Sequence, residues 1–298
     1  MVSRARELQF PYQLDSLADL PENFRRAAET NLPSSETPVE ILLIPPGTFY
    51  DAPNKRGGAW NAPRQAAIFT TNGILHILDA AGGHCPATYL PAANLLYAYH
   101  SLILLYGRLE LAGVVHGELA RMVIEYNTVG QHLIQPLLNR LLDSAYGATP
   151  GVAENDAQTQ PLLEQLQAQS YKFANGLRLY GLLPGERLLG TVFQPRITRP
   201  FLKIFHLPAA PNCLLALTDR AVIMIDEERV RGAAYGWLVT LCPRRLVRGM
   251  DIHPAKWWQE IRLYLEQQGV ESIHSARMDA ERAERWQRLW QAGITKAA

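Results

Sequence analysis

The residues best suited to covalent chemistry in this chain are Cys85 and the histidine before it. They lie in the run Gly82-Gly83-His84-Cys85-Pro86, where a glycine-rich turn would expose a thiolate nucleophile next to a base. Adjacent residues seldom have the geometry for such a proton transfer, and glycine with proline is also the composition of an ordinary hairpin turn. We favour the turn and keep a cysteine-dependent enzyme as the alternative.

No other pattern of catalytic or metal-binding residues stands out. The sequence has no GxxxxGKS/T phosphate loop, no GxGxxG dinucleotide turn, no HExxH zinc helix and no GxSxG nucleophile elbow. Its three cysteines, Cys85, Cys213 and Cys242, form no CxxC pair. We therefore expect a protein that is not an enzyme and that holds no metal and no other cofactor.

The second half of the chain carries an excess of basic side chains. Residues 180–298 contain 17 Lys and Arg against 12 Asp and Glu, whereas residues 38–148 contain 6 against 7. The whole chain has a net charge of only +1, too small an excess for a protein that coats nucleic acid, so no nucleic-acid partner is expected. The candidate anion-binding or lipid-binding residues form two clusters: Arg196, Arg199 and Lys203, and then Arg244, Arg245 and Arg248.

Each basic cluster has two interpretations. Arginine and lysine would hold phosphate or a lipid head group through charge-assisted hydrogen bonds. A solvated basic loop that keeps the protein soluble has the same composition, and the acidic residues 226–228 lie between the clusters in sequence.

A long loop in the first half combines aromatic and basic residues. Phe49, Tyr50 and Trp60 share it with Lys55 and Arg56, among glycines and prolines. This composition suits a tip that inserts into a membrane or binds a partner, although packing against a neighbouring part of the chain would also explain it.

Strand patterns dominate the segments that must position these residues. In the second half, strand-like runs occur at 187–193, 213–217, 221–225, 235–241, 246–252, 260–266 and 270–278. Asp279 is a candidate N-cap for an amphipathic helix in which Ala283, Trp286, Leu289 and Trp290 recur on one face. In the first half, similar runs at 41–44, 66–69, 74–78, 95–105, 108–111 and 119–126 precede a helix over 133–142, with Pro136 expected in its first turn.

The two halves repeat one another weakly but in the same order. Glu40-Ile-Leu-Leu resembles Glu186-Arg-Leu-Leu, the segment 68–79 resembles 216–227, and Thr88-Tyr-Leu-Pro resembles Thr240-Leu-Cys-Pro. The offset grows only from 146 to 152 residues, as loop insertions would make it grow. A length of 298 residues also favours two domains over one.

Helices and a linker complete the organisation. Residues 147–159 are small and polar, as in a surface linker, and Thr159 would cap a helix that Asn175-Gly176 ends. A short helix at 22–31 occupies the equivalent place before the first unit. We expect an N-terminal segment at 1–37, a first domain at 38–148, a linker and helix at 149–179, and a second domain at 180–298.

About seven strands followed by one helix is the element order of a pleckstrin-homology (PH) domain. Both units resemble bacterial PH-like domains through a glycine-glutamate before the first strand, a Thr-Asp/Asn turn and a later Tyr-Gly to Pro segment. The second unit has Gly185-Glu186, Thr218-Asp219-Arg220 and Tyr235-Gly236 to Pro243; the first departs from this, with Val39-Glu40, Thr71-Asn72-Gly73 and Tyr89-Leu90-Pro91.

The resemblance implies an α+β, mainly β fold. Each unit would place about seven antiparallel strands in two orthogonally packed sheets capped by the C-terminal helix, with an additional helix leading into it. In lipid-binding PH domains basic residues of the first connection hold the head group, a role that would pass to Arg196, Arg199 and Lys203.

Taken together, these patterns predict an interaction or scaffold protein that binds a protein partner or its own copy. Peripheral binding to an anionic membrane surface is the alternative. The amino terminus shows no export signal, because acidic and polar residues interrupt it before an apolar core develops, and the cysteines suit a reducing compartment. We expect a cytoplasmic protein, with peripheral membrane association under the alternative.

Overall fold

The computed structural model describes residues 10–49, 59–80, 84–147, 155–201, 205–230 and 233–295. Antiparallel sheets make up most of it, which confirms the predicted α+β, mainly β class. The chain divides into two compact units: residues 1–147 with 230–236, and residues 148–229 with 237–298. Within the described ranges, no helix combines the length and the apolar character that crossing a bilayer requires.

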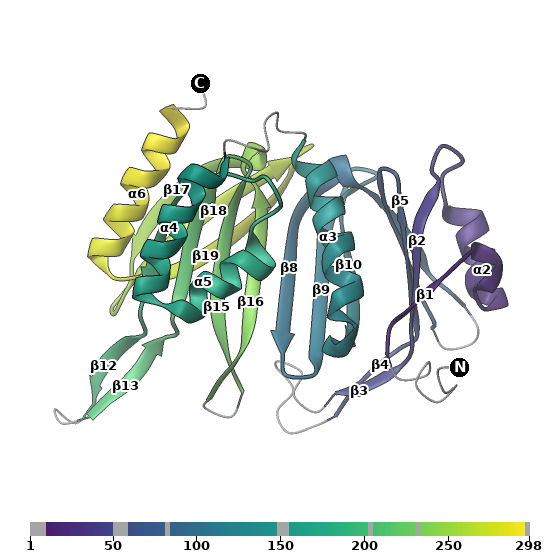
Figure 1. Ribbon diagram of the computed structural model, residues 1–298, viewed down its shortest axis with the longest axis horizontal. Coiled ribbons are helices and arrows are strands. Elements are labelled where there is room, and N and C mark those ends of the chain that lie inside the picture. Colours follow the sequence, from purple (N-terminus) through teal and green to yellow (C-terminus); the bar gives the residue numbers. More distant parts are fainter. Residues whose placement is uncertain are drawn as a thin grey trace. The chain divides into compact units, whose positions relative to one another are not determined.

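The first unit begins with a five-stranded sheet in the order β1-β2-β5-β6-β7. Helix α2 (Glu22–Asn31), at the predicted position, covers one face of it and buries Phe24 and Ala28 against Ile41 and Ile68. Figure 1 shows α2 on the outer side of β1 and β2. The segment before residue 38 therefore contributes to the core. The strands are β1 (Tyr12–Leu14), β2 (Pro38–Ile44), β5 (Gln65–Thr70), β6 (Gly73–Leu78) and β7 (Ala87–Pro91).

Three more strands and a helix follow in the first unit. Strands β8 (Leu95–Ile103), β9 (Tyr106–Val115) and β10 (Glu118–Asn127) pair as consecutive hairpins. Helix α3 (Gln131–Tyr146) buries Ile134, Leu138 and Leu142, at the spacing of four residues that one helix face requires. The predicted place of Pro136 is wrong: α3 begins five residues earlier, so the proline lies in the second turn and has no N–H to donate there.

The second unit repeats this order of elements (Figure 1). Four strands pair in the order β16-β15-β14-β11, three others form a sheet in the order β17-β18-β19, and a helix follows. In both units a short hairpin, β3–β4 or β12–β13, is inserted after the first of the four strands. The ranges are β11 (Leu188–Gln194), β14 (Cys213–Thr218), β15 (Ala221–Val230), β16 (Ala233–Pro243), β17 (Val247–Pro254), β18 (Gln259–Gln267), β19 (Val270–Met278) and α6 (Ala280–Thr295).

Four irregularities in the strand ladders fall at equivalent places in the two units, whereas a fifth, at Ile197 in β12, has no counterpart in the β3–β4 ladder. The register shifts between Pro38 and Glu40 in β2 and between Leu188 and Gly190 in β11. It shifts again at the start of β8 and at the start of β17, each time directly after a short 3-10 helix. Since a bulge is a specific local feature of a strand pair, this agreement supports the repeat more strongly than the sequence matches do.

A buried glutamate stabilises the turn that precedes the first strand of the second unit. Leu183-Pro184-Gly185-Glu186 forms a turn in which Gly185 has a φ of 75°, a value that favours glycine. The Glu186 carboxylate accepts hydrogen bonds from the Leu183 N–H, at 2.9 Å, and from the Thr218 hydroxyl. The Gly-Glu and Thr-Asp motifs of the resemblance are therefore two sides of one structural contact.

The first unit contains an equivalent glutamate contact, made by Glu36 and not by the residue that the sequence repeat suggests. Glu36 is the last residue of a turn, and its backbone N–H donates to the Pro33 carbonyl. The Glu36 carboxylate accepts hydrogen bonds from the Asn72 backbone N–H at 3.0 Å and from the Asn72 side chain at 3.2 Å. By these contacts the equivalent of Glu186 is Glu36, whereas the sequence comparison had paired Glu186 with Glu40.

The helices that lead into the second unit differ from the prediction. Thr159 was expected to be an N-cap, but it lies inside α4 (Asn155–Gln169), where its hydroxyl accepts a hydrogen bond from Leu188 N at 3.0 Å. The break occurs at Ser170, which caps α5 (Tyr171–Gly176). Asn175-Gly176 does not end the helical segment, because a π-turn continues it to Gly181.

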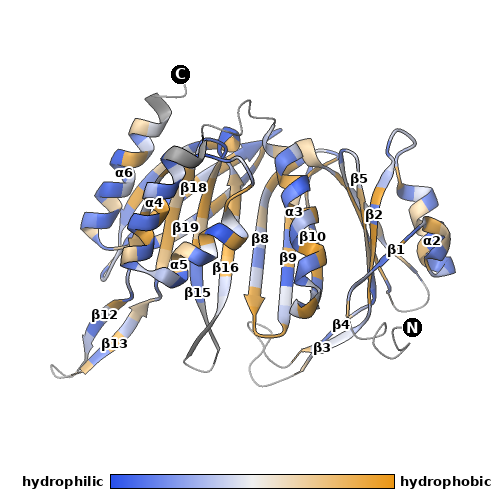
Figure 2. Ribbon diagram, in the orientation of Figure 1, coloured by the Kyte–Doolittle hydropathy of each residue, from blue (hydrophilic) through white to orange (hydrophobic). Residues whose placement is uncertain are grey.

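Helix α6 closes the second unit through one apolar face. Ala283, Trp286 and Trp290 are buried, as the helical spacing predicts. Gly190 of β11 allows close contact, since a Cβ there would lie 2.6 Å from a methyl of Leu289. Figure 2 shows α6 largely blue, with scattered apolar positions, and the inner strands of both units rich in orange.

Candidate anion-binding hairpin of the second unit

The first predicted basic cluster lies on a projecting hairpin. The connection after β11 folds into β12 (Ile197–Phe201) and β13 (Phe205–Ala210), a two-stranded sheet of its own that extends from one end of the second unit (Figure 1). Arg196 and Arg199 are exposed, and within the described residues no carboxylate pairs with either. Lys203 lies outside the described residues.

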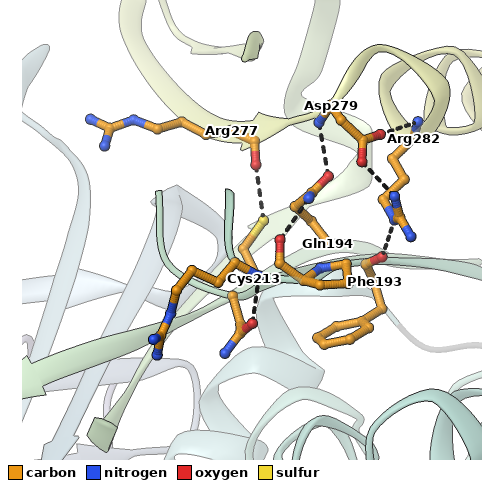
Figure 3. Close-up of polar contacts among 9 residues, drawn as sticks. Phe193, Gln194, Cys213, Arg277, Asp279 and Arg282 are labelled. Atoms are coloured by element: carbon orange, nitrogen blue, oxygen red, sulfur yellow. Dashed lines mark hydrogen bonds and ion pairs between the residues drawn. The ribbon is translucent and has the colours of Figure 1, made fainter. Parts of the chain in front are cut away.

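Polar contacts hold the base of this hairpin in place (Figure 3). The buried Gln194 side chain accepts from the Asp279 N–H at 2.8 Å and donates to the Pro195 carbonyl at 2.6 Å. Arg196 N donates to the Asn212 side chain at 2.7 Å, so both strands of the hairpin are anchored where they leave the main sheet. An isolated two-stranded ribbon is only marginally stable, and these bonds compensate for that.

The start of α6 belongs to the same anchor. Asp279 accepts from the Arg282 N–H at 2.9 Å, which confirms Asp279 as the helix N-cap, and its carboxylate also pairs with the Arg282 guanidinium. Arg282 Nε then donates to the Phe193 carbonyl at 2.9 Å (Figure 3). Arg282 is therefore occupied by structural contacts and is not a free cation at the hairpin.

Glu227, a buried acidic residue near the base of the hairpin, pairs with a lysine and not with the hairpin arginines. Glu227 accepts from Lys172 Nζ at 2.7 Å and from the Asn212 side chain, and Lys172 lies 4.7 Å from the centroid of the Trp237 ring. Although Glu227 lies between the two basic clusters in sequence, it does not neutralise the hairpin arginines.

The second basic cluster is used differently. Arg244 donates to the Gly293 carbonyl of α6 at 2.6 Å and to the Thr218 carbonyl at 3.3 Å, and burial lowers the pKa of its guanidinium. Arg248 pairs with Glu266 on the neighbouring strand at 3.4 Å, while Arg245 is exposed. Arg244 therefore docks α6 to the sheet and does not present its charge to a ligand.

The structure keeps the two basic clusters apart. Arg196 bonds to Asn212 just before β14 begins, whereas Arg244 bonds to Thr218, where β14 ends. Five strand steps of about 3.3 Å separate these ends by about 17 Å. The described residues of the two clusters therefore do not form one site, and the hairpin is the better candidate.

The aromatic residues of the first unit are partly withdrawn from solvent. Phe49 in β3 (Gly47–Phe49) and Trp60 in β4 (Trp60–Ala62) are cross-strand partners. Phe49 is 9% exposed and packs edge-on against Tyr106, with ring centroids 4.9 Å apart, and Trp60 packs on the same cluster. Phe49 thus belongs to a small hydrophobic core and is not at the tip of a membrane-inserting loop. Tyr50, Lys55 and Arg56 lie outside the described residues.

Cys85 is poorly placed for nucleophilic chemistry. Burial, together with the charge of Asp79, raises the pKa of its thiol, and the Asn23 side chain lies at hydrogen-bond distance, 3.2 Å, from the sulfur. A catalytic thiolate needs the opposite shift. Among the described residues no group of histidine, cysteine and carboxylate side chains is arranged to hold a metal ion.

Sequence reasoning missed a set of buried polar residues inside the first unit. His76 lies 3.0 Å from Gln65, whose amide donates to the Glu125 carbonyl at 3.2 Å. The only sequence signal was a polar residue inside each of two apolar runs, 65–70 and 73–78. The Glu125 carboxylate accepts from the Tyr106 hydroxyl at 2.6 Å. All four side chains are buried, so this network is internal to the first unit.

Glu186 gives the second unit a pH-dependent contribution to stability. Burial raises its pKa to about 7 from 4.5, so the folded state binds the proton more tightly than the unfolded state. The contribution of Glu186 to the free energy of unfolding is fully present below pH 4.5 and is lost as the pH rises through 7. Between pH 5 and pH 8 this loss amounts to about 2–3 kcal/mol. In Glu186→Gln we expect this loss to disappear, as measured by urea unfolding of both proteins at each pH.

The exposed Glu284→Gln on α6 is the matched control and should keep the wild-type pH profile. A Glu186→Gln protein with the wild-type profile would show that Glu186 ionises at its ordinary pH.

Comparison with known proteins adds no relative. No protein-family model matches the chain, and no curated protein sequence matches it.

Proposed function

We propose that this chain is a non-enzymatic interaction protein built from two PH-like units. In each unit four antiparallel strands, three more antiparallel strands and a helix follow in the order of a PH domain. Two orthogonally packed sheets with a helix at the open end would be the corresponding architecture. The shared bulges support the view that the two units are copies of one such fold.

The function that the geometry supports best is peripheral attachment of a cytoplasmic protein to an anionic membrane surface. The observation that carries it is the β12–β13 hairpin, which presents Arg196 and Arg199 to solvent from an anchored base. Guanidinium groups bind phosphate oxygens in a planar, bidentate geometry, which suits a lipid head group.

An apolar residue on the same hairpin favours a membrane over a free phosphate. Phe205 begins β13 with 58% of its surface exposed, on the same hairpin as Arg196 and Arg199. Aromatic rings are most favourable at the boundary between head groups and acyl chains, and basic residues beside them are attracted to the negative surface. The hairpin thus combines the two contributions that reversible membrane binding needs.

Vesicle sedimentation tests this function. We expect wild-type chain to bind vesicles of phosphatidylcholine with 30% phosphatidylserine at low salt, and not to bind pure phosphatidylcholine. Since each basic residue near such a surface contributes about 1 kcal/mol, changing Arg196, Arg199 and Lys203 to alanine should weaken binding roughly a hundred-fold.

A control with the same change in charge separates a site from bulk attraction. Lys256, Arg285 and Arg288 are exposed residues of the same unit that are not part of the hairpin, and their triple alanine variant should bind almost normally. Equal losses in the two triple variants, or no binding by wild type at low salt, would exclude the hairpin as a lipid site.

A second candidate function is binding of a protein partner or of a second copy. Specific observations favour it: among the described strands, each unit has a sheet that ends at an unpaired edge, at β7 in the first and at β17 in the second. Unpaired strand edges present main-chain donors and acceptors that another extended chain satisfies.

A further inference from the structure

The edge strand β7 of the first unit has a ladder on one side only. It is last in the sheet order, and among the described strands it pairs with β6 alone. Two hydrogen bonds fix the phase of that ladder: Leu78 N donates to the Pro86 carbonyl at 3.0 Å, and Ala92 N donates to the Asn72 carbonyl at 2.7 Å.

This phase determines which main-chain groups face outward. Hydrogen-bonded and non-hydrogen-bonded pairs alternate along an antiparallel ladder, so Thr88 and Leu90 bond to β6. The N–H and C=O groups of Ala87 and Tyr89 therefore point away from the sheet. They are two residues apart, which is the spacing that one added strand would meet.

Prolines limit what this edge can accept. Pro86 precedes β7 and Pro91 ends it, and neither has an N–H to donate. The outward edge therefore offers donors only at two positions, over a length of about three residues. A long strand of a second copy would meet gaps at both ends, whereas a short extended segment would not.

A groove runs beside this edge. Its volume is about 590 Å³, within the range of ligand and peptide pockets. Its walls come from the end of α2, from β7 and from the β9–β10 hairpin. Its lining includes Ala87, Tyr89, Val115, His116, Glu118 and Leu119.

The far wall of the groove is a tight, well-defined turn. His116 and Gly117 both have positive φ, 53° and 82°, the combination of a two-residue type I′ hairpin turn. Such a turn matches the twist of its strands, so the positions of Val115 and Glu118 on either side of it are set by the β9–β10 ladder, in which they are partners.

The side chains of the groove indicate which peptide it would select. Leu119 is an exposed apolar residue, with 36% of its surface accessible, and Val115 and Tyr89 extend the apolar lining. Glu118 is exposed and is the one charged lining residue, histidine aside, in the described part of the groove. The lining is therefore complementary to an apolar side chain next to a basic one.

We propose that β7 and this groove bind a short extended peptide segment that carries an apolar residue beside a lysine or arginine. The segment adds as a strand to the outer edge of β7 through the main chain of Ala87 and Tyr89, with its basic residue at Glu118. This inference rests on the protein-binding candidate above and is independent of the β12–β13 hairpin.

Selection of random linear 12-residue peptides on the full chain, followed by anisotropy with synthetic fluorescent copies of the selected sequences, tests the site. We expect the sequences to share an apolar–basic pair. Ala87→Pro removes an outward N–H at the first position of β7 without breaking the β6 ladder, and it should weaken binding about five- to tenfold. Glu118→Lys should weaken it by a similar factor, whereas the exposed Glu164→Lys of the second unit should not.

Hydrogen exchange on the wild-type chain gives a readout that does not depend on a variant folding. Bound peptide should slow exchange of the Ala87 and Tyr89 amides and leave that of Thr88 nearly unchanged. The Arg196, Arg199 and Lys203 triple variant should bind the peptides normally, so failure of the membrane function leaves this result intact. The proposal is overturned if no peptide is selected, or if the selected peptides neither protect the Ala87 and Tyr89 amides nor distinguish Glu118→Lys from Glu164→Lys.

Discussion

Acidification from pH 8 to pH 5 is expected to cost the first unit about 4 kcal/mol of stability through two buried histidines. Burial lowers the pKa of His76 to about 4 and that of His100 to about 3, from an ordinary 6.5. The unfolded state therefore binds protons more tightly. Each contribution is complete above pH 6.5 and is lost as the pH falls toward the folded pKa, which gives about 2 kcal/mol per imidazole by pH 5.

The surroundings of both rings favour the neutral form. His76 lies 3.0 Å from the Gln65 side chain, and His100 lies 2.6 Å from the Tyr126 hydroxyl, which in turn donates to Gln131. The Gln65 amide and the Tyr126 hydroxyl are neutral groups, so they form hydrogen bonds with the imidazoles without stabilising a positive charge.

Hydrogen exchange in β8 and β9, corrected for the intrinsic rate at each pH, measures this loss. His76→Gln and His100→Gln should each reduce the difference between pH 8 and pH 5 by about half, whatever they do to stability at pH 8. The exposed His132→Gln of the same unit is the control and should leave the difference unchanged. A full pH dependence in both core variants would mean that other groups cause it.

Trp286→Ala should destabilise the second unit by about 3–5 kcal/mol. Trp286 is fully buried on the face of α6 that packs against the sheets, together with Ala283 and Trp290. Its removal would leave a cavity that the neighbouring helix and strands fill only partly, because α6 is held at its start by Asp279 and at its end by Arg244. Urea unfolding followed by tryptophan fluorescence measures the change.

Two control variants test the cause. The indole Nε1 of Trp286 has no hydrogen-bond partner among the described residues, so Trp286→Phe should cost less than about 1.5 kcal/mol. Gln287→Ala, next to it on the exposed face, should change stability by less than about 0.5 kcal/mol. If Trp286→Ala were as mild as Gln287→Ala, α6 would not be packed as the structure has it.

Prediction from the sequence succeeded where the signal is local. The β18–β19 hairpin, the N-cap at Asp279 and the buried face of α6 follow from residue types a few positions apart, and all three are confirmed. Strands β3, β4, β7, β12 and β13 were not expected, because they are short and contain or adjoin proline or glycine, which lowers the strand signal of the sequence.

The candidate site was only half predictable. Basic residues in one connection are visible as composition, and so Arg196 and Arg199 were found. No local sequence feature distinguishes them from Arg244, whose guanidinium donates hydrogen bonds to the Thr218 and Gly293 carbonyls. Which arginine is exposed depends on residues 26 and 49 positions away from Arg244 in the sequence.

The amino-acid sequence alone established the class of fold, the approximate positions of the longer strands and of α2, α3 and α6, the repeat and the location of the basic excess, because side-chain periodicity and turn chemistry act over a few residues. Long-range contacts established the remainder. Through such contacts Glu36 is the counterpart of Glu186, and the Thr159 hydroxyl accepts a hydrogen bond from β11 where a helix cap was expected. Phe49 is buried against Tyr106, and β7 lies at the edge of its sheet. Each of these outcomes depends on a partner more than 28 residues away or on the absence of a neighbouring strand among those described, and no local pattern encodes either.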